Sequence, residues 1–213
     1  MKILQYLFIS LSHKILKLLP YTSIRILSVP IGTLYFLLTF RSSIKLFRRK
    51  EIFNELKINY KPLIVKINYT RYWLETLWLT NENFSKYISQ HVEIENLEYV
   101  EKLKKQYPGL IFALPHLGNW EFAIPIGNSI KLNLLAVAEP LNNSYVLNWF
   151  KSLRESLGIE IIIGGKGQNT FDLLVNKLKS GKDICLLSER SIKKSGVATE
   201  FFGQLAACLL YTS

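Results

Sequence analysis

The stretch PHLGNWEF (115–122) carries a histidine and a glutamate whose spacing could support acid–base chemistry. His116 follows the apolar run LIFAL (110–114), and Glu121 comes five positions after the histidine. On one regular helix, five steps of 100° would leave the two side chains about 140° apart. They can cooperate only if His116 lies on a loop and Glu121 lies in the first turn of the helix that follows. The spacing therefore predicts a loop-to-helix transition between them.

The residues between the pair favour this transition. Pro115 and Gly118 break regular structure, and Asn119 is a good N-cap for the next helix. A carboxylate in the first turn of a helix is stabilised in its charged form by the helix dipole. Beside an imidazole, such a carboxylate sets the tautomer and stabilises the imidazolium, as a general base requires. We therefore hypothesise that His116 deprotonates a bound hydroxyl and that Glu121 orients the imidazole.

Other kinds of site find less support in the sequence. A histidine with a glutamate five residues later also occurs in purely structural positions, because most histidines are not catalytic. No serine or cysteine stands in a nucleophile-elbow context, so a covalent intermediate is not indicated. The three histidines and two dispersed cysteines give no zinc-ligand spacing, so we expect no metal. The loop IIIGGKGQNT (161–170) lacks the G-x-x-x-x-G-K-[ST] spacing of a phosphate-binding loop.

The runs that follow residue 109 predict the elements that position this pair. Apolar runs indicate strands at 110–114, 132–138, 159–163 and 183–188. Helical patterns lie between them at 120–130, 143–158 and 170–181, with Asn143 as an N-cap and Gly158 past a C-terminus. Such alternation predicts the α/β class, with a mostly parallel central sheet and flanking helices. Chemistry then gathers beyond the carboxyl ends of the strands, where both His116 and Glu189 fall.

The net charge of +11 is concentrated in the N-terminal part of the chain. Residues 1–90 contain 14 Lys or Arg against 4 Glu, whereas residues 91–213 contain 13 against 12 Asp or Glu. Apolar side chains recur at helical spacing in residues 1–20, and a second apolar run covers 26–40. That run has 15 residues, and about 20 are needed to cross a bilayer, so we expect an interfacial or re-entrant helix.

The partner of this basic, apolar region is expected to be a membrane phospholipid surface. Arg41, Lys45, Arg48, Arg49 and Lys50 directly follow the second apolar run and could hold anionic headgroups. Two core helices with a solvated charged face remain an alternative, because they have the same pattern. Nucleic acid is not expected, since no binding motif is present and the interleaved residues are mostly Leu and Ile instead of stacking aromatics.

The segment HLGNWE (116–121) resembles the H-x4-D/E motif of acyltransferases that acylate lipid hydroxyls. More specifically, it is similar to the bacterial branch that contains lipid A late acyltransferases and phosphatidylinositol mannoside acyltransferases. Further blocks resemble the mannoside enzymes in the same order, over roughly residues 65–205. These blocks are RYWLE (71–75), AVAE (136–139), RESLG (154–158), LLSER (186–190) and SGVATEFFG (195–203).

The resemblance implies a glycerolipid acyltransferase-like fold and acyl transfer from acyl-CoA or acyl carrier protein, with no other cofactor. The acceptor would be a sugar hydroxyl of a glycolipid at the cytoplasmic face of the inner membrane, where His116 would be the base and Glu121 its orienting carboxylate. Backbone N–H groups at Gly118 and Asn119 are candidates for the oxyanion. The resemblance places four further residues in the site as substrate-binding groups: Glu139, Arg154, Glu189 and Arg190.

The mannoside acceptor is preferred, because AVAE and SGVATEFFG fit that branch better. A lipid A lauroyl or myristoyl acyltransferase is the alternative, and a non-enzymatic membrane-binding protein follows if the chain truly ends at 213. We expect a membrane-associating helical region at 1–64, an incomplete acyltransferase domain at 65–206 and a foreign tail at 207–213. Ser191 departs from the family pattern, which often has an acidic residue there, and ACLLYTS (207–213) looks foreign to the family.

Overall fold

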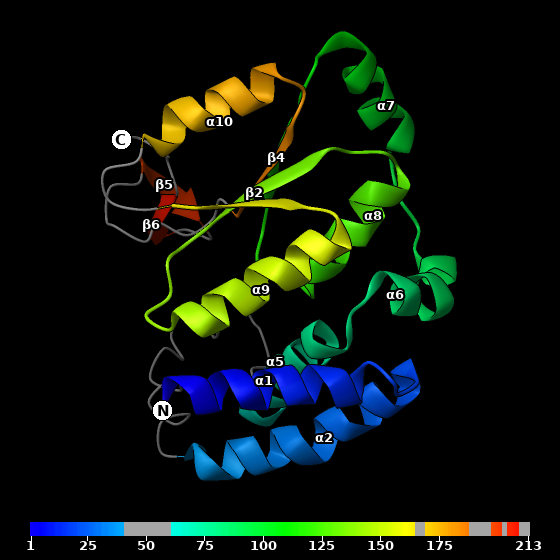
Figure 1. Cartoon of the computed structure of the whole chain (residues 1–213), viewed down its shortest axis with the longest axis vertical. Helices are drawn as coiled ribbons and strands as arrows, with labels where there is room; N and C mark the ends of the chain where they lie inside the picture. Colours follow the sequence, from blue (N-terminus) through cyan, green and yellow to red (C-terminus); the bar gives the residue numbers. More distant parts are fainter. Residues whose placement is uncertain (41–60, 165–168, 188–196, 202–203, 209–213) are drawn as a thin grey trace. The chain divides into compact units, whose positions relative to one another are not determined.

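The computed structural model describes residues 1–40, 61–164, 169–187, 197–201 and 204–208 (Figure 1). The chain divides into two compact units, each described here by itself. The first unit contains Met1–Phe8 and Thr80–Ser213, and the second contains Ile9–Leu79. Their boundary falls within the N-terminal helix α1 (Lys2–Leu16). The predicted headgroup-binding cations at 41–50 lie outside the described residues.

A four-stranded parallel sheet forms the centre of the first unit. Its strands are β1 (Ile111–Leu114), β2 (Leu134–Ala138), β3 (Glu160–Ile163) and β4 (Asp183–Leu187). They lie in the order β1-β4-β2-β3, so that β4 pairs with both β1 and β2. Each strand falls within a predicted apolar run, and the predicted α/β class is confirmed. Because all pairs are parallel, the carboxyl ends of the strands share one edge of the sheet.

Helices flank this sheet, as Figure 1 shows. Helices α8 (Ala123–Ser129), α9 (Ser144–Leu157) and α10 (Thr170–Lys179) contact β2, β3 and β4, respectively. The other helices of this unit after residue 80 are α6 (Asn81–Tyr87), η1 (Ser89–His91), α7 (Leu97–Gln106) and η2 (Trp120–Phe122). Helix α9 follows the predicted N-cap Asn143, whose Oδ1 accepts from the backbone N–H of Tyr145 at 3.2 Å. It ends at Gly158, which has a φ of +103° and so takes the left-handed conformation that glycine favours.

The core of the sheet forms where strands β2 and β4 meet helix α10. Leu135, Ile184 and Leu174 are buried together there. Four partly buried side chains pack around them: Val137, Ile162, Leu178 and Leu186. Side chains from the sheet and from the helix therefore share one apolar layer, which fixes α10 against the strands.

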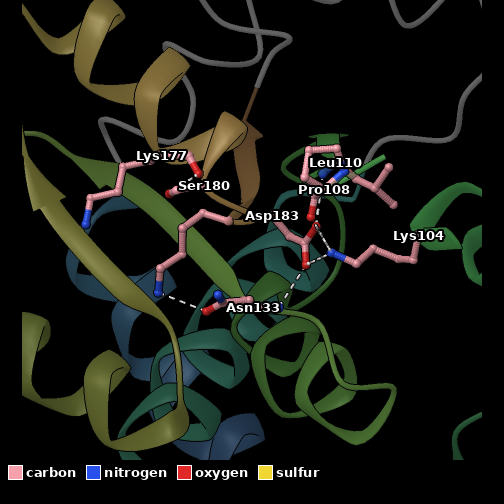
Figure 2. A network of polar contacts seen from close by, with 8 residues as sticks. Lys104, Pro108, Leu110, Asn133, Lys177, Ser180 and Asp183 are labelled. Atoms are coloured by element: carbon pink, nitrogen blue, oxygen red, sulfur yellow. Dashed lines mark hydrogen bonds and ion pairs between the residues drawn. The ribbon is translucent and has the colours of Figure 1, made fainter. Parts of the chain in front are cut away.

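A buried carboxylate lies at the end of the sheet where the strands begin, and it accepts hydrogen bonds from the backbone just before β1 and just before β2 (Figure 2). Asp183, the first residue of β4, is completely buried. Its Oδ1 accepts from the backbone N–H of Leu110 at 3.0 Å, and its Oδ2 accepts from the N–H of Asn133 at 2.8 Å. Lys104, near the end of α7, donates to both oxygens at 2.9 and 3.0 Å. We call Asp183, Lys104 and these two amides the Asp183 cluster.

The first unit also contains a hairpin that the sequence analysis did not predict as strands. Strands β5 (Val197–Phe201) and β6 (Gln204–Cys208) pair in antiparallel fashion, with Val197 opposite Cys208. Part of this hairpin lies in the segment 207–213, which we expected to be foreign to the family.

The second unit is built on two packed helices, α2 (Tyr21–Leu38) and α5 (Pro62–Trp78). Gly32 of α2 permits their close approach, because a Cβ at this position would lie 2.6 Å from the Cα of Ile67. At the other end, the indole Nε1 of Trp78 donates to the carbonyl of Leu19 at 2.8 Å. Trp78 is completely buried, so this hydrogen bond satisfies a polar group that packing removes from water.

Helix α2 is longer than the apolar run from which we expected it. It begins at Tyr21, directly after Pro20, and continues through Pro30 as one helix of 18 residues. The helix is therefore long enough and apolar enough to cross a membrane. The core helix of a soluble protein and a signal sequence can have the same length and composition. The apolar run in the sequence was counted from Ile26, so it left out residues 21–25 at the start of the helix. An interfacial or re-entrant position of this helix stays a prediction.

Candidate active site

The loop after β1 carries His116 at the carboxyl edge of the sheet. Gly118 on this loop has a φ of +61°, and a Cβ there would meet nothing within 4 Å. The glycine is thus favoured by its backbone conformation and not by a lack of space. Asn119 then caps the helical turn η2, since its Oδ1 accepts from the backbone N–H of Glu121 at 3.2 Å. The predicted loop-to-helix transition between His116 and Glu121 is confirmed.

Glu121 and His116 occupy opposite environments. Glu121 is 1% exposed, whereas His116 is exposed on its loop. An exposed imidazole can reach a substrate, and a carboxylate that is closed off from solvent cannot. The arrangement therefore suits His116 to contact a reacting group and suits Glu121 to act through its neighbours.

Arg154 of helix α9 holds the buried carboxylate. Its Nη2 donates to Oε1 of Glu121 at 2.7 Å, and its Nε donates to Oε2 at 3.1 Å. Two donors of a planar guanidinium thus meet two oxygens of one carboxylate, which is the strongest geometry for such a pair. A buried carboxylate requires a partner of this kind, because burial of an unpaired charge costs several kcal/mol. This pair joins the turn after β1 to α9.

Aromatic rings pack against the same guanidinium. The Arg154 Cζ lies 4.8 Å from the ring centroid of Trp120 and 5.7 Å from that of Phe150. Trp120 precedes Glu121 in the chain, and Phe150 lies one turn before Arg154 on α9. Contacts over aromatic faces restrict the orientation of the guanidinium and add a cation–π attraction. The side chain of Arg154 is accordingly only 18% exposed.

This geometry refines the role expected for Arg154. We expected it to line the site as a substrate contact, which stays a prediction, and the structure adds that its Nε and Nη2 donate to Glu121. No sequence signal predicts this pair, because 33 residues separate the partners and the spacing follows no local period. The nearest hint was RESLG (154–158), where a cation near a helix C-terminus could equally have been an exposed surface residue.

The remaining predicted site residues are placed only in part. Glu139 is exposed directly after β2, at the same edge of the sheet as His116. Gly118 and Asn119 lie on the loop and at its capping position, as described above. Glu189 and Arg190, which follow β4, lie outside the described residues. Thus His116 and Glu139 each follow a strand, at the end of the sheet where the strands terminate. Glu121 is buried beneath the surface on which His116 is exposed.

Comparison with known proteins agrees with the motif. The family model for bacterial lipid A biosynthesis acyltransferase matches residues 2–212. The chain belongs to this family. The resemblance read from HLGNWE (116–121) is therefore confirmed.

Two curated relatives of this chain add detail. The phosphatidylinositol mannoside acyltransferase of Mycolicibacterium smegmatis is 30% identical over 141 residues, which is 64% of this chain and 45% of that protein. The phosphatidylinositol mannoside acyltransferase of Mycobacterium tuberculosis (strain H37Rv) is 32% identical over 139 residues, 64% of this chain and 44% of that protein. The matched region spans less than half the length of each relative.

Proposed function

We propose that this chain belongs to a membrane-associated O-acyltransferase. It would move a fatty acyl group from acyl-CoA or acyl carrier protein to a sugar hydroxyl of a glycolipid. The observation that carries this proposal is the exposed His116 beyond the end of β1, with the buried pair of Glu121 and Arg154 behind its loop. Family membership and the names of the relatives support the same reaction class.

In this reaction His116 acts as the general base. Its imidazole takes the proton of the sugar hydroxyl while the hydroxyl oxygen attacks the carbonyl carbon of the thioester. The tetrahedral intermediate then collapses, the C–S bond breaks, and the thiolate takes the proton from the imidazolium. An ester and a free thiol leave, and the histidine returns to its neutral form. Positioned acid–base catalysis of this kind contributes about 10²–10⁴-fold to a rate.

Glu121 and the loop backbone assist without taking part in bond exchange. Held by Arg154, the carboxylate keeps the turn after His116 fixed, so that the imidazole is presented in one orientation. The backbone N–H groups of Gly118 and Asn119 are the proposed donors to the negative oxygen that develops on the thioester carbonyl. Glu139, at the same edge, would contact the acceptor sugar.

A phosphatidylinositol mannoside is the preferred acceptor, because both curated relatives carry that substrate in their names. A lipid A precursor is the second candidate, favoured by the description of the family model. Both acceptors present sugar hydroxyls on a lipid anchor, so the same base serves either of them. What separates them is the part of the site that binds the sugars and the headgroup.

We further propose that the enzyme works at the cytoplasmic face of the bacterial inner membrane. Large apolar side chains on the N-terminal helices are open to the surroundings instead of packed. Strongly exposed ones are Leu4 and Phe8 on α1 and Ile26, Leu37 and Leu38 on α2, and Leu18 is exposed in the turn between these helices. Apolar surface of this extent is stable in contact with lipid and unfavourable in water. The acyl donors are cytoplasmic, which places the active site on that side.

The experiment that tests this proposal is an acyl-transfer assay with two acceptors. Labelled long-chain acyl-CoA or acyl carrier protein is supplied with either a phosphatidylinositol mannoside or a lipid A precursor. Transfer to one of them is expected, and His116→Ala should lower kcat by about 10²-fold or more. The matched control is His91→Ala, because His91 is an exposed histidine in η1, away from the strand ends.

Two results would contradict the proposal. Unchanged transfer by the His116→Ala variant would remove the assigned base. Absence of transfer to either acceptor, with vesicle binding retained by the unaltered chain, would favour the non-enzymatic membrane-binding alternative.

A further inference from the structure

A polar contact links the two main helices of the second unit. The hydroxyl of Tyr21, at the start of α2, donates to Oε1 of Glu75 near the end of α5 at 2.8 Å. Glu75 is 5% exposed, so this hydrogen bond is made inside the helix pair. Further along, Gly32 of α2 meets Ile67 of α5. Chain positions rise on one helix while they fall on the other, so the helices run antiparallel.

This arrangement places two arginines on the same side of the Tyr21–Glu75 contact. Arg25 is four residues after Tyr21, and Arg71 is four residues before Glu75. Residues four apart share a helix face and lie one turn apart. Because the helices are antiparallel, one turn forward on α2 and one turn back on α5 lead to the same level. Arg25 and Arg71 therefore lie at the same level on two facing helices, and their side chains can reach the same region.

Arg71 has a buried donor with no acceptor among the described residues. Its Nε is shielded from solvent and makes no hydrogen bond. A buried N–H without an acceptor costs about 1–3 kcal/mol, and such groups are rare in folded proteins. Arg71 as a residue is only partly buried, so an acceptor can reach its side chain. Paired N–H groups in a fixed fork match the oxygens of a carboxylate or a phosphate.

The charge around this donor favours an anion. In the described part of the second unit, residues 9–40 and 61–79, Glu75 is the only acidic residue against six Lys or Arg. Burial and Glu75 raise the pKa of Tyr21 to about 12, and the charges of Arg25 and Arg71 act in the opposite direction. Both guanidinium groups are thus close enough to act on the same phenol.

We propose that Arg71 and Arg25 bind the phosphoryl group of an anionic phospholipid headgroup. Arg25 is exposed, and exposed apolar side chains adjoin it on α2: Ile26 next in the chain and Val29 one turn further. Headgroup phosphates occupy this kind of border between apolar and polar surroundings. The inference deepens the proposed function and rests on it for one point only, that the acceptor is itself a lipid with such a phosphate.

Binding of a soluble headgroup to the full chain tests this directly. Glycerophosphoinositol is titrated while the ¹⁵N resonance of the Arg71 Nε–H is followed, and inorganic phosphate is titrated in parallel. The resonance is assigned by its absence from Arg71→Lys, a variant that keeps the charge but loses the fork. We expect the resonance to shift on titration, and Arg71→Lys to weaken binding by at least about tenfold.

Two further variants separate this site from general attraction. Arg25→Gln, at an exposed position where folding is not at risk, should also weaken glycerophosphoinositol binding. Lys14→Gln removes one exposed charge elsewhere on the same unit and should leave that binding within about twofold, because exposed charges at a distance are screened. If the soluble headgroup binds, vesicles of phosphatidylcholine with phosphatidylinositol should bind less Arg71→Lys protein than unaltered protein.

Three outcomes would overturn the proposal. One is an Arg71 Nε–H resonance that does not move, and another is an equal loss in Lys14→Gln and Arg71→Lys. The third is tight binding of inorganic phosphate with no effect of Arg71→Lys on vesicle binding, which would assign the site to free phosphate. None of these measurements uses acyl transfer, so they can fail while the proposed reaction stands, and the reverse also holds.

Discussion

At the scale of single residues, the pair of Glu121 and Arg154 explains why a charged group sits at the border of the core. The carboxylate is closed off from water, and the fork of Arg154 replaces the hydrogen bonds that water would supply. Removing one partner of such a pair leaves an uncompensated buried charge, which costs far more than the pair itself contributes. The two residues therefore act as one structural group that fixes the turn after His116.

Arg154→Met should destabilise the fold by about 3–5 kcal/mol, because Glu121 would remain buried without a counter-charge. Arg154→Lys keeps the charge but loses the fork, so it should cost less stability and still lower kcat. Urea unfolding measured beside the transfer assay checks both statements. Lys151→Gln, which breaks only the exposed 3.7 Å pair with Glu155, is the control and should cost less than about 0.5 kcal/mol. Native stability in Arg154→Met would contradict this assignment.

Cys185 in strand β4 gives a second prediction at this scale. Burial, followed by the charge of Asp183, raises the pKa of its thiol to about 11. The thiolate is the reactive form, so little of it exists at neutral pH. Alkylation by iodoacetamide at pH 8 should therefore be slow in the folded protein and fast in denaturant. Mass spectrometry of the Cys185 peptide follows this residue alone, and equal rates in the two states would contradict the prediction.

At the scale of elements, the Asp183 cluster determines how three parts of the chain meet. The first two strands in the chain, β1 and β2, are not neighbours in the sheet, and β4 lies between them. The carboxylate of Asp183 accepts from the backbone just before β1 and just before β2, and from Lys104 near the end of α7. One side chain thereby sets the position at which β4 enters the sheet.

Asp183→Asn should destabilise the first unit by about 3–5 kcal/mol. The amide cannot accept at both positions, so it would direct a donor at the N–H of Leu110 or Asn133 and leave the Lys104 charge without its partner. Thermal unfolding followed by circular dichroism measures the loss. Glu101→Gln, at an exposed acidic position on α7, should change stability by less than about 0.5 kcal/mol. An equal effect of the two substitutions would contradict the assigned role.

The contact between α2 and α5 predicts a dependence of stability on alkaline pH. In the folded state the pKa of Tyr21 is raised from 10.0 to about 12, chiefly by burial. Between pH 10 and 12 the folded state therefore keeps a proton that the unfolded state has lost. The contribution of the protonated Tyr21 to the free energy of unfolding is complete below pH 10. It is lost progressively as pH rises from 10 to 12.

Tyr21→Phe should remove this part of the pH dependence. The measurement compares urea unfolding of the variant and the unaltered protein at pH 9, 10, 11 and 12. Tyr99→Phe is the control, because Tyr99 is 62% exposed on α7. Parallel curves for the Tyr21→Phe variant and the unaltered protein between pH 10 and 12 would contradict the prediction.

At the scale of the whole molecule, the distribution of apolar and basic residues predicts attachment to a membrane. Exposed apolar side chains are numerous on α1 and α2, and residues 1–90, which include both helices, hold most of the excess positive charge. The two features act together, since apolar burial holds a protein in lipid and basic residues draw it to an anionic surface.

Leu38→Glu should weaken binding to vesicles that contain phosphatidylinositol by about tenfold or more. Leu38 is 78% exposed on α2, and insertion of a leucine side chain into lipid contributes about 1.5–3 kcal/mol. The control is Phe171→Glu on α10, a 51% exposed apolar position in the first unit, which should leave binding unchanged. Vesicle flotation measures both variants. Equal binding of Leu38→Glu and unaltered protein would indicate that this face is covered by protein instead of lipid.

The sequence by itself determined the local elements and the transition in PHLGNWEF (115–122). Apolar runs, the capping residues Asn119 and Asn143, and Gly158 act within a few residues of their own positions, so their effect can be read from the chain alone. Only the tertiary structure decided the insertion of β4 between β1 and β2 and the pairing of Arg154 with Glu121. These contacts join distant residues, and they are selected by packing and by the need to pair buried charges, which no local pattern encodes.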